Sequence, residues 1–223
     1  MRAEREGTAG MDGEHALITG GGTGIGLAIA RALAGAGCAV TITGRRAGVL
    51  EAAAAEVPGL HPLVMDVSDE AGVEEGFAEA VAARGPVAIH VANAGIAEGR
   101  ALHKTDTEFW RRMMATNLDG AFLTIRAALG SMRGLDRGRV IAVSSIAGVK
   151  GLKGAAAYSA SKHGMLGLIR GLAADYAGKG ITFNALCPAY VETEIIDRNV
   201  ASIRERAGVS EEEAMRMMVG LNP

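Results

Sequence analysis

The feature that most constrains the fold is a regular alternation of short apolar runs with longer helix-like segments along almost the whole chain of 223 residues. Six apolar runs are expected to form strands, at 16–18, 40–42, 63–65, 87–91, 140–143 and 182–186. They lack an apolar–polar alternation, which is typical of strands covered on both faces. Strand–helix alternation predicts a parallel sheet with right-handed crossovers, so we expect a single α/β domain with a doubly wound sheet.

The segments between the apolar runs have helical periodicity. Helices are expected to begin near Ile25, Ala47 and Glu70, and two longer ones are expected at about 107–132 and 157–177. Each long helix places four large side chains on one face, which are Phe122, Ile125, Leu129 and Met132 on the first and Met165, Ile169, Leu172 and Tyr176 on the second.

Composition excludes several classes of protein. A formal net charge of -2 creates no global field that attracts nucleic acid or a membrane surface, and no apolar run has transmembrane length. Residues 1–14 lack the apolar core of a signal peptide, so we expect a disordered lead-in to a cytoplasmic protein. Cys38 and Cys187 are far apart and are expected to be small apolar residues beside strands. The five histidines have no metal-ligand spacing, so no metal is expected.

A glycine-rich turn follows the first predicted strand and leads directly into a helix. Its sequence, TGGGTGIG at 19–26, spaces the glycines as GxxxGxG. Backbone amides at a helix start can bind a pyrophosphate, and glycines let the phosphates approach closely. The residues expected to bind a dinucleotide here are Gly20, Thr23, Gly24, Ile25 and Gly26; the alternative is a glycine-rich turn without a ligand.

The end of the second predicted strand indicates which dinucleotide is bound. Sheets that prefer NAD carry an acid there, which binds the ribose hydroxyls. This chain has Arg45 and Arg46 instead. A guanidinium suits a 2′-phosphate, so the sequence favours NADP(H) as cofactor, with NAD(H) possible. The alternative is a pair of solvated arginines at a helix start.

Tyr158 and Lys162 are the strongest candidates for chemistry. Four residues apart on a predicted helix, they share one face. A nearby ammonium favours the phenolate and is expected to lower the tyrosine pKa from about 10. Ser145 follows the fifth strand, at the edge where parallel sheets bind ligands, and is placed to hydrogen-bond a substrate oxygen. The alternative for Tyr158 and Lys162 is an ordinary surface pair.

Together these motifs resemble the short-chain dehydrogenase/reductase family, over about residues 15–193. The glycine turn, Ser145, Tyr158 and Lys162 carry most of the resemblance. Asp66 and Val67 resemble an adenine-binding acid and its neighbour, and Asn93, Ala94 and Gly95 resemble the NNAG motif. Asn117 resembles the helix asparagine of a catalytic tetrad. Pro188, Val191 and Thr193 resemble the loop that binds the nicotinamide. Ala92 and Ala189 depart from the family pattern, and Ala189 leaves the path of that loop open because glycine there can serve a special backbone angle.

The resemblance implies a role for each tetrad residue. Tyr158 would exchange a proton with the substrate oxygen while hydride moves between nicotinamide and carbon. Lys162 would lower the tyrosine pKa and bind the nicotinamide ribose, so that Tyr158 and Lys162 would both also contact the cofactor. Asn117 would hold a water that links Lys162 to solvent, and Ser145 would orient the reacting oxygen.

Within the family, the sequence looks most like reductases of 3-oxoacyl thioesters or polyketide intermediates. The predicted function is hydride transfer between NADP(H) and a carbonyl or alcohol substrate of this kind. Two alternatives stay open: an NAD-dependent dehydrogenase of a small hydroxy acid, alcohol or sugar, and a non-catalytic dinucleotide sensor. The intact tetrad favours an enzyme. Lys150 and Lys153 are expected to flank the cleft mouth, where they would meet a phosphate of an acyl carrier or remain solvated.

The resemblance also implies the domain organisation. Residues 15–223 would form one dinucleotide-binding catalytic domain of the Rossmann type, with a substrate lid at about 189–223. The family's sheet has a further helix and strand after the lid, and no segment remains for them, so we expect them to be lacking here. A homodimer or homotetramer is expected, paired through the helices at 107–132 and 157–177.

Overall fold

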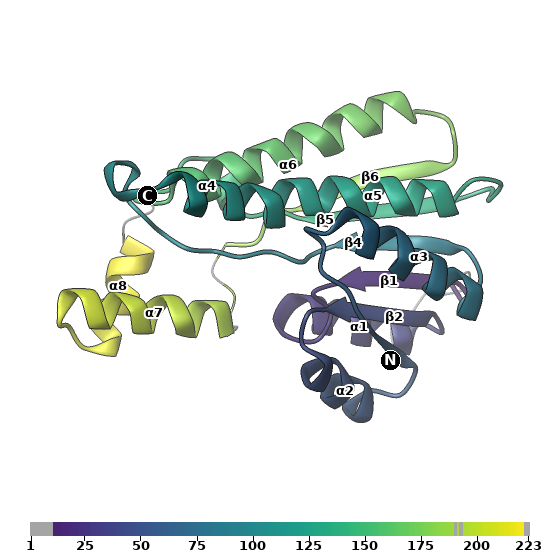
Figure 1. Ribbon diagram of the computed structural model, residues 1–223, viewed down its shortest axis with the longest axis horizontal. Coiled ribbons are helices and arrows are strands. Elements are labelled where there is room, and N and C mark those ends of the chain that lie inside the picture. The colour runs from purple at the N-terminus through teal and green to yellow at the C-terminus, as the bar shows by residue number, and fades with distance from the viewer. Residues whose placement is uncertain (1–10, 190, 192–193, 221–223) are drawn as a thin grey trace, which may run out of the picture.

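The computed structural model describes residues 11–189, 191 and 194–220, and it contains one six-stranded sheet (Figure 1). The strands are β1 (His15–Thr19), β2 (Ala39–Gly44), β3 (Leu60–Val64), β4 (Val87–Ala92), β5 (Gly138–Val143) and β6 (Ile181–Leu186). Their order is β3-β2-β1-β4-β5-β6, and every neighbouring pair is parallel. The predicted doubly wound α/β fold is confirmed. Because the order reverses between β1 and β4, a ligand crevice is expected at their carboxyl ends.

One strand begins earlier than the sequence predicted. β3 starts at Leu60 rather than at 63, and it contains Pro62. A proline normally argues against a strand because it has no N–H for the ladder, but it is tolerated on an edge strand. β3 is an edge of the sheet and pairs only with β2.

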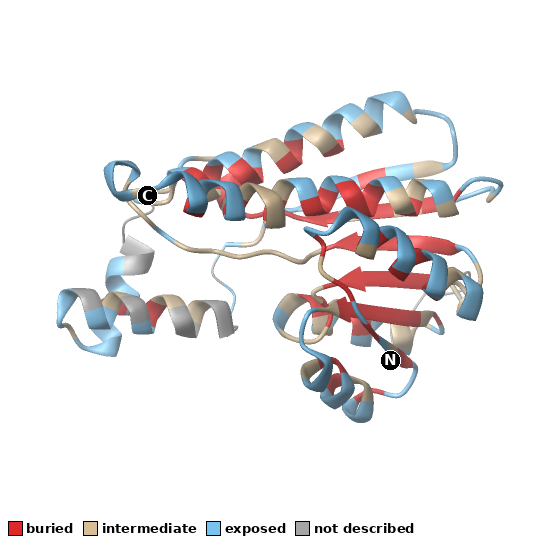
Figure 2. Cartoon of the chain, in the orientation of Figure 1, coloured by how far each residue is buried: buried red, intermediate tan, exposed pale blue. Residues whose placement is uncertain are grey.

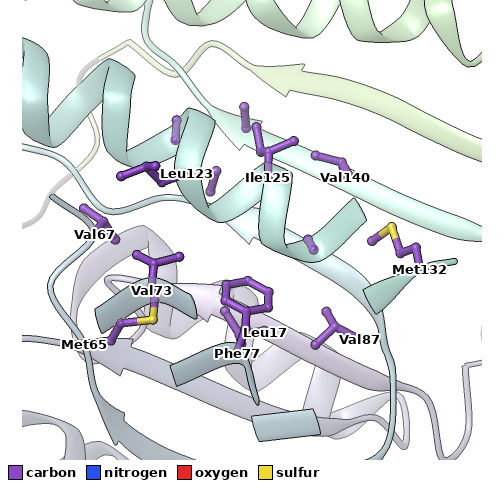
Figure 3. Close-up of a cluster of buried hydrophobic side chains, with 14 of the residues drawn as sticks. Leu17, Met65, Val67, Val73, Phe77, Val87, Leu123, Ile125, Met132 and Val140 are labelled. Atoms are coloured by element: carbon purple, nitrogen blue, oxygen red, sulfur yellow. The ribbon is translucent and has the colours of Figure 1, made fainter. Parts of the chain in front are cut away.

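Helices cover both faces of the sheet. They are α1 (Gly24–Gly35), α2 (Ala47–Glu56), α3 (Glu70–Arg84), α4 (Thr107–Met114), α5 (Gly120–Ser131), α6 (Ala156–Asp175), α7 (Glu194–Ala207) and α8 (Glu211–Gly220). Side chains of α1 and α2 pack on one face of the sheet. Those of α3, α5 and α6 pack on the other, where Phe77 and Ile125 meet Leu17 and Val140 (Figure 3). The central strands are therefore buried on both sides (Figure 2), which explains their unalternating apolar sequences.

The helix predicted at 107–132 is interrupted. A π-helical turn, η2 (Ala115–Asp119), separates α4 from α5. The turn precedes all four residues of the predicted face, so it does not change their placement relative to one another. Ile125 and Met132 of that face are buried, whereas Phe122 is 45% exposed with the Arg126 guanidinium 5.4 Å from its ring centre.

Two other expectations need correction. Part of the N-terminal segment expected to be disordered is packed on the domain: the Gly13 amide donates to the carbonyl of Gly37 at 2.9 Å, and Glu14 pairs with Arg137 at 2.6 Å. Residues 1–10 lie outside the described part. Cys38 is buried as expected, but Cys187 is exposed, because it directly follows the edge strand β6.

The segment expected to form a lid contains α7 and α8, which pack against each other and lie to one side of the sheet (Figure 1). Val200 on α7 and Ala214 on α8 are buried. Across the described ranges, no helix is long and apolar enough to cross a membrane. In the same residues, His, Cys, Asp and Glu side chains nowhere gather in threes that could hold a metal ion.

His90 on β4 is a buried titratable group in the core. Its Nδ1 lies 3.1 Å from the carbonyl oxygen of Leu17, and its ring meets Phe77 edge-on at 5.5 Å. Its Nε2 has no hydrogen-bond partner among the described residues. Burial lowers the pKa of His90 from 6.5 to about 4. Because Nδ1 faces a carbonyl oxygen, it carries the proton, and the imidazole is neutral at pH 7.

This shift predicts an acid-sensitive stability. In the unfolded chain this histidine takes up a proton near pH 6.5, whereas in the folded protein it stays neutral down to about pH 4. The contribution of His90 to the free energy of unfolding is therefore fully present above pH 6.5 and is lost as the pH falls toward 4. The free energy of unfolding that is lost through protonation of His90 is ~3 kcal/mol. Chemical denaturation of wild type and His90→Asn between pH 4 and 7 should show a shallower slope in the variant, whose amide still reaches Leu17. His103→Asn, at an exposed position, should keep the wild-type slope; equal slopes in all three proteins would contradict the assignment.

Candidate active site

The carboxyl ends of the strands open into a cavity of about 740 Å³. Most of the residues predicted from the sequence line it: Gly20, Thr23, Gly24, Ile25, Gly26, Arg45, Asp66, Val67, Asn93, Ala94, Gly95, Ser145, Tyr158, Lys162, Pro188 and Val191. Asn117 is buried behind the wall, and Thr193 lies outside the described residues. One cavity thus joins the predicted dinucleotide and catalytic residues.

The ends of β1 and β4 are tied together where the sheet order reverses. The Thr19 hydroxyl accepts the amide protons of Asn93 and Ala94, each at 3.0 Å. The Asn93 side chain donates back to the carbonyls of Thr19 and Gly20, at 2.9 and 3.1 Å. The loops that follow the two strands therefore leave the sheet from one fixed point.

The glycine turn forms a cradle that larger residues would fill. Gly20 and Gly24 have positive φ angles of 63° and 53°. A Cβ on Gly26 would collide with the carbonyl oxygen of Gly20. The N-cap of α1, Thr23, makes no side-chain capping hydrogen bond, and the first turn contains no acid. Amides at this helix start are therefore left for an anion, and the cradle fits the pyrophosphate of a dinucleotide.

Basic and acidic groups follow β2 and β3 at the far end of the same cavity. Arg45 Nη1 lies 3.9 Å from Asp66 Oδ2, and both side chains are accessible to solvent. Burial raises the pKa of Asp66, but hydrogen bonds from Ser68 and the charge of Arg45 outweigh it and hold the pKa below 3.8. Asp66 is therefore an anionic acceptor. Arg46 also lines the cavity, at the start of α2.

Tyr158, Ser145 and Lys162 meet at the opposite end. Burial raises the pKa of Tyr158 above 10.0, while a hydrogen bond with Ser145 acts in the lowering direction. Lys162 Nζ donates to the Val143 carbonyl at 2.8 Å and lies 5.9 Å from the Tyr158 ring centre. The net shift of Tyr158 is thus opposite to the lowering expected from Lys162, because desolvation of the phenol dominates.

Lys162 is itself strongly perturbed. Its side chain is buried, and burial lowers its pKa from 10.5 to about 8. The backbone of Gly95 passes beside it, since a Cβ added there would lie 3.6 Å from Lys162 Nζ and 3.2 Å from Asn117 Oδ1. A glycine at this position leaves the β4 loop close to both groups, and a Cβ would be a tight fit against Asn117.

Asn117 holds a loop rather than facing the cavity. Its side chain accepts the Ile96 amide proton at 2.8 Å and donates to the Ile96 carbonyl at 2.9 Å. It also donates to the Ser161 hydroxyl at 3.1 Å, which in turn donates to the Tyr158 carbonyl at 2.8 Å. The predicted tetrad residue is thus connected to Tyr158 through Ser161, which sequence reasoning missed. Its position three residues after Tyr158 was the available signal.

The remaining wall comes from two loops and from α7. Ile196, Asn199 and Ile203 line the cavity and share one face of that helix. Their spacing of three and four residues was a readable signal that the sequence analysis did not use. Of the two lysines expected at the mouth, Lys153 lines the cavity and Lys150 does not.

Comparison with known proteins gives one consistent result. A family model for short chain dehydrogenases matches residues 14–203. An acetoacetyl-CoA reductase of Rhizobium meliloti (strain 1021) is 43% identical over 183 residues, covering 81% of this chain and 75% of the reductase. A putative ketoacyl reductase of granaticin polyketide synthase from Streptomyces violaceoruber is 41% identical over 208 residues, covering 89% and 75%. The crystal structure of a variant of actinorhodin polyketide ketoreductase with NADPH aligns with a TM-score of 0.88 at 34% identity, covering 93% of this chain and 82% of that chain.

The chain therefore belongs to the short-chain dehydrogenase family, as the motifs predicted. It is an oxidoreductase on a Rossmann-type sheet, related to ketoreductases.

Gly26→Ala tests whether the glycine cradle binds the dinucleotide. The added methyl group displaces the Gly20 carbonyl and the Asn93 side chain, so we expect at least ~10-fold weaker binding of NADPH, as for the loss of a charge-assisted hydrogen bond. Titration of NADPH fluorescence measures the affinity. Gly35→Ala is the matched control, because a Cβ at this other end of α1 meets nothing within 4 Å. Unchanged affinity in Gly26→Ala, or equal loss in both variants, would contradict the cradle's role.

Proposed function

We propose that the chain is an NADP(H)-dependent carbonyl reductase that acts on 3-oxoacyl-type ketones. The observation that carries this proposal is the convergence of Tyr158, Ser145 and Lys162 in the same cavity as the glycine cradle. The names of its relatives, an acetoacetyl-CoA reductase and a ketoacyl reductase, support the substrate class.

The ionisation of Tyr158 suits the direction of reduction. A pKa above 10.0 keeps the phenol protonated at neutral pH, so it can donate its proton to a carbonyl oxygen. Ser145, already hydrogen-bonded with that phenol, is placed to orient the same oxygen. The bound cofactor supplies the hydride.

Lys162 and Asn117 support Tyr158, the first through its charge and the second by positioning. Within the described residues the lysine Nζ has one hydrogen bond, to Val143, which leaves donor capacity for a ribose hydroxyl or for the phenolate that forms when Tyr158 gives up its proton. Charge on Lys162 would stabilise that phenolate. Asn117 fixes the Ile96 loop and, through Ser161, the backbone of Tyr158. We assign it a positioning role, with its predicted water-holding role still a proposal.

The preference for NADP(H) rests on Arg45 and Arg46 at the cavity end that follows β2. A 2′-phosphate there would meet two guanidiniums, and Asp66 would accept a hydrogen bond from the adenine amino group. Asn93, Ala94 and Gly95 would back the adenosine, while Pro188 and Val191, with Thr193 of the undescribed part, would contact the nicotinamide.

Tyr158→Phe tests the proton donor. The substitution removes one hydroxyl and keeps the ring that packs against the cluster of Phe109, Met113 and Ala157, so we expect kcat to fall by at least ~10²-fold with little change in NADPH affinity. Turnover of a 3-oxoacyl thioester, followed by loss of NADPH absorbance, measures the effect. A variant that retains most of its kcat would exclude Tyr158 as the donor.

Arg45→Ala tests the cofactor preference. Loss of a charge-assisted contact to phosphate should lower the ratio of kcat/KM with NADPH to kcat/KM with NADH by roughly one to two decades. Arg31→Ala is the control, since Arg31 is exposed on α1, pairs with Glu56 and does not line the cavity. Equal or better efficiency of the wild-type protein with NADH would contradict the assignment.

A further inference from the structure

The cavity is cationic although the chain is not. Among the described residues, seven charged ones line it: Arg45, Arg46, Arg100, Lys153 and Lys162 against Asp66 and Glu98. Five cationic and two anionic groups leave a lining charge of +3, on a chain whose formal net charge is -2. Such a concentration of one sign in a cleft attracts anions.

Two of these cations lie away from the dinucleotide cradle. Ile96 and Tyr158 pack together against the cluster that contains Phe109. The Arg100 guanidinium stacks on the Phe109 ring, 4.2 Å from its centre. A Cβ added at Gly99 would lie 3.3 Å from the Gly154 carbonyl oxygen, so the loop that carries Arg100 touches the loop that carries Lys153. Both cations therefore flank the Tyr158 end of the cavity.

Arg100 is held in place before any ligand arrives. Its Nη1 donates to Asp106 Oδ2 at 3.0 Å, and Asp106 is fixed in turn as the N-cap of α4 by the Phe109 amide at 2.7 Å. A guanidinium has five N–H donors, so several are left for a ligand. Because its side chain is already ordered, binding costs little conformational entropy.

Lys153 has the opposite character. Its side chain is exposed at the cavity wall, and nothing in the described ranges pairs with it by a hydrogen bond or an ion pair. The nearby acid of the lining, Glu98, is matched by Arg112 through two hydrogen bonds of 2.8 and 2.9 Å. Arg100 is paired with Asp106, so the positive charge that has no acidic partner among the described residues at this end resides on Lys153, while Arg100 keeps guanidinium N–H donors for a ligand. We call Arg100 and Lys153 the basic rim.

We infer that the basic rim binds an anionic group of the substrate, so that the enzyme selects ketones that carry a carboxylate or a phosphate away from the reacting carbonyl. The inference rests on the proposed function for the position of that carbonyl at Tyr158. The negative charge could come from a phosphate on an acyl-thioester carrier or from the carboxylate of a free 3-oxo acid, since both are anions that would pair with the basic rim. The experiment below separates them.

Binding to the protein saturated with NADP⁺ tests the rim without turnover, because the oxidised cofactor fills the Arg45 end and cannot reduce a ketone. Calorimetry compares three compounds with the same 3-oxobutanoyl group: acetoacetyl-CoA, which carries phosphates, its neutral N-acetylcysteamine thioester, and acetoacetate. We expect acetoacetyl-CoA or acetoacetate to bind at least ~5-fold more tightly than the neutral thioester, the upper range for an exposed ion pair. The tighter of the two anions identifies the source of the negative charge.

Lys153→Glu should abolish or reverse this preference, and Arg100→Gln should reduce it. Lys150→Glu introduces the same charge change three residues away, outside the cavity lining, and should leave the preference as in the wild type. The preference should also weaken as salt rises from about 0.05 to about 0.5 M, through Debye screening of exposed charges.

Equal binding of the charged and neutral compounds, or an equal loss in Lys153→Glu and Lys150→Glu, would overturn the inference. These outcomes are independent of catalysis. If the compounds bind as expected but NADPH reduces none of them, the proposed function fails and the anion-binding rim stands.

Discussion

The site depends on one set of hydrogen bonds, those between Thr19 and Asn93 at the carboxyl ends of β1 and β4. These strands are neighbours in the sheet, but Thr19 and Asn93 are 74 residues apart in the chain. Their loops turn in opposite directions because the strand order reverses there. The glycine cradle leaves on one side and the loop that contains Gly95 and Ile96 leaves on the other.

The second loop connects the sheet to α6, the helix that carries Tyr158 and Lys162. Gly95 passes beside Lys162, and Ile96 is held on both backbone polar groups by Asn117. Asn117 lies in the π turn η2, and a further hydrogen bond from its side chain leads through Ser161 to Tyr158. The cradle and Tyr158, the proposed proton donor, are thus connected through a short chain of hydrogen bonds, most of them partly buried. Partial exclusion of water strengthens such bonds.

Features with a local physical cause could be predicted from the sequence. The buried strands, the glycine turn and the i, i+4 pair of Tyr158 and Lys162 follow from periodicity and backbone sterics. The π turn at Asn117, the exposure of Phe122 and the raised pKa of Tyr158 could not, because each depends on packing between segments distant in sequence. The same holds for Arg100: no local signal distinguishes a cation stacked on Phe109 from a solvated one.

The central claim is that hydride passes from a bound nicotinamide to a carbonyl carbon while Tyr158 supplies the proton. The most direct test incubates the wild-type protein with acetoacetyl-CoA and NADPH carrying deuterium at nicotinamide C4 on one face, then the other, and weighs the hydroxyacyl product by mass spectrometry. The account predicts one deuterium at the new carbinol carbon with one of the two labelled cofactors and none with the other. A product without deuterium from either cofactor would contradict it, as would the absence of product under conditions in which NADPH binds.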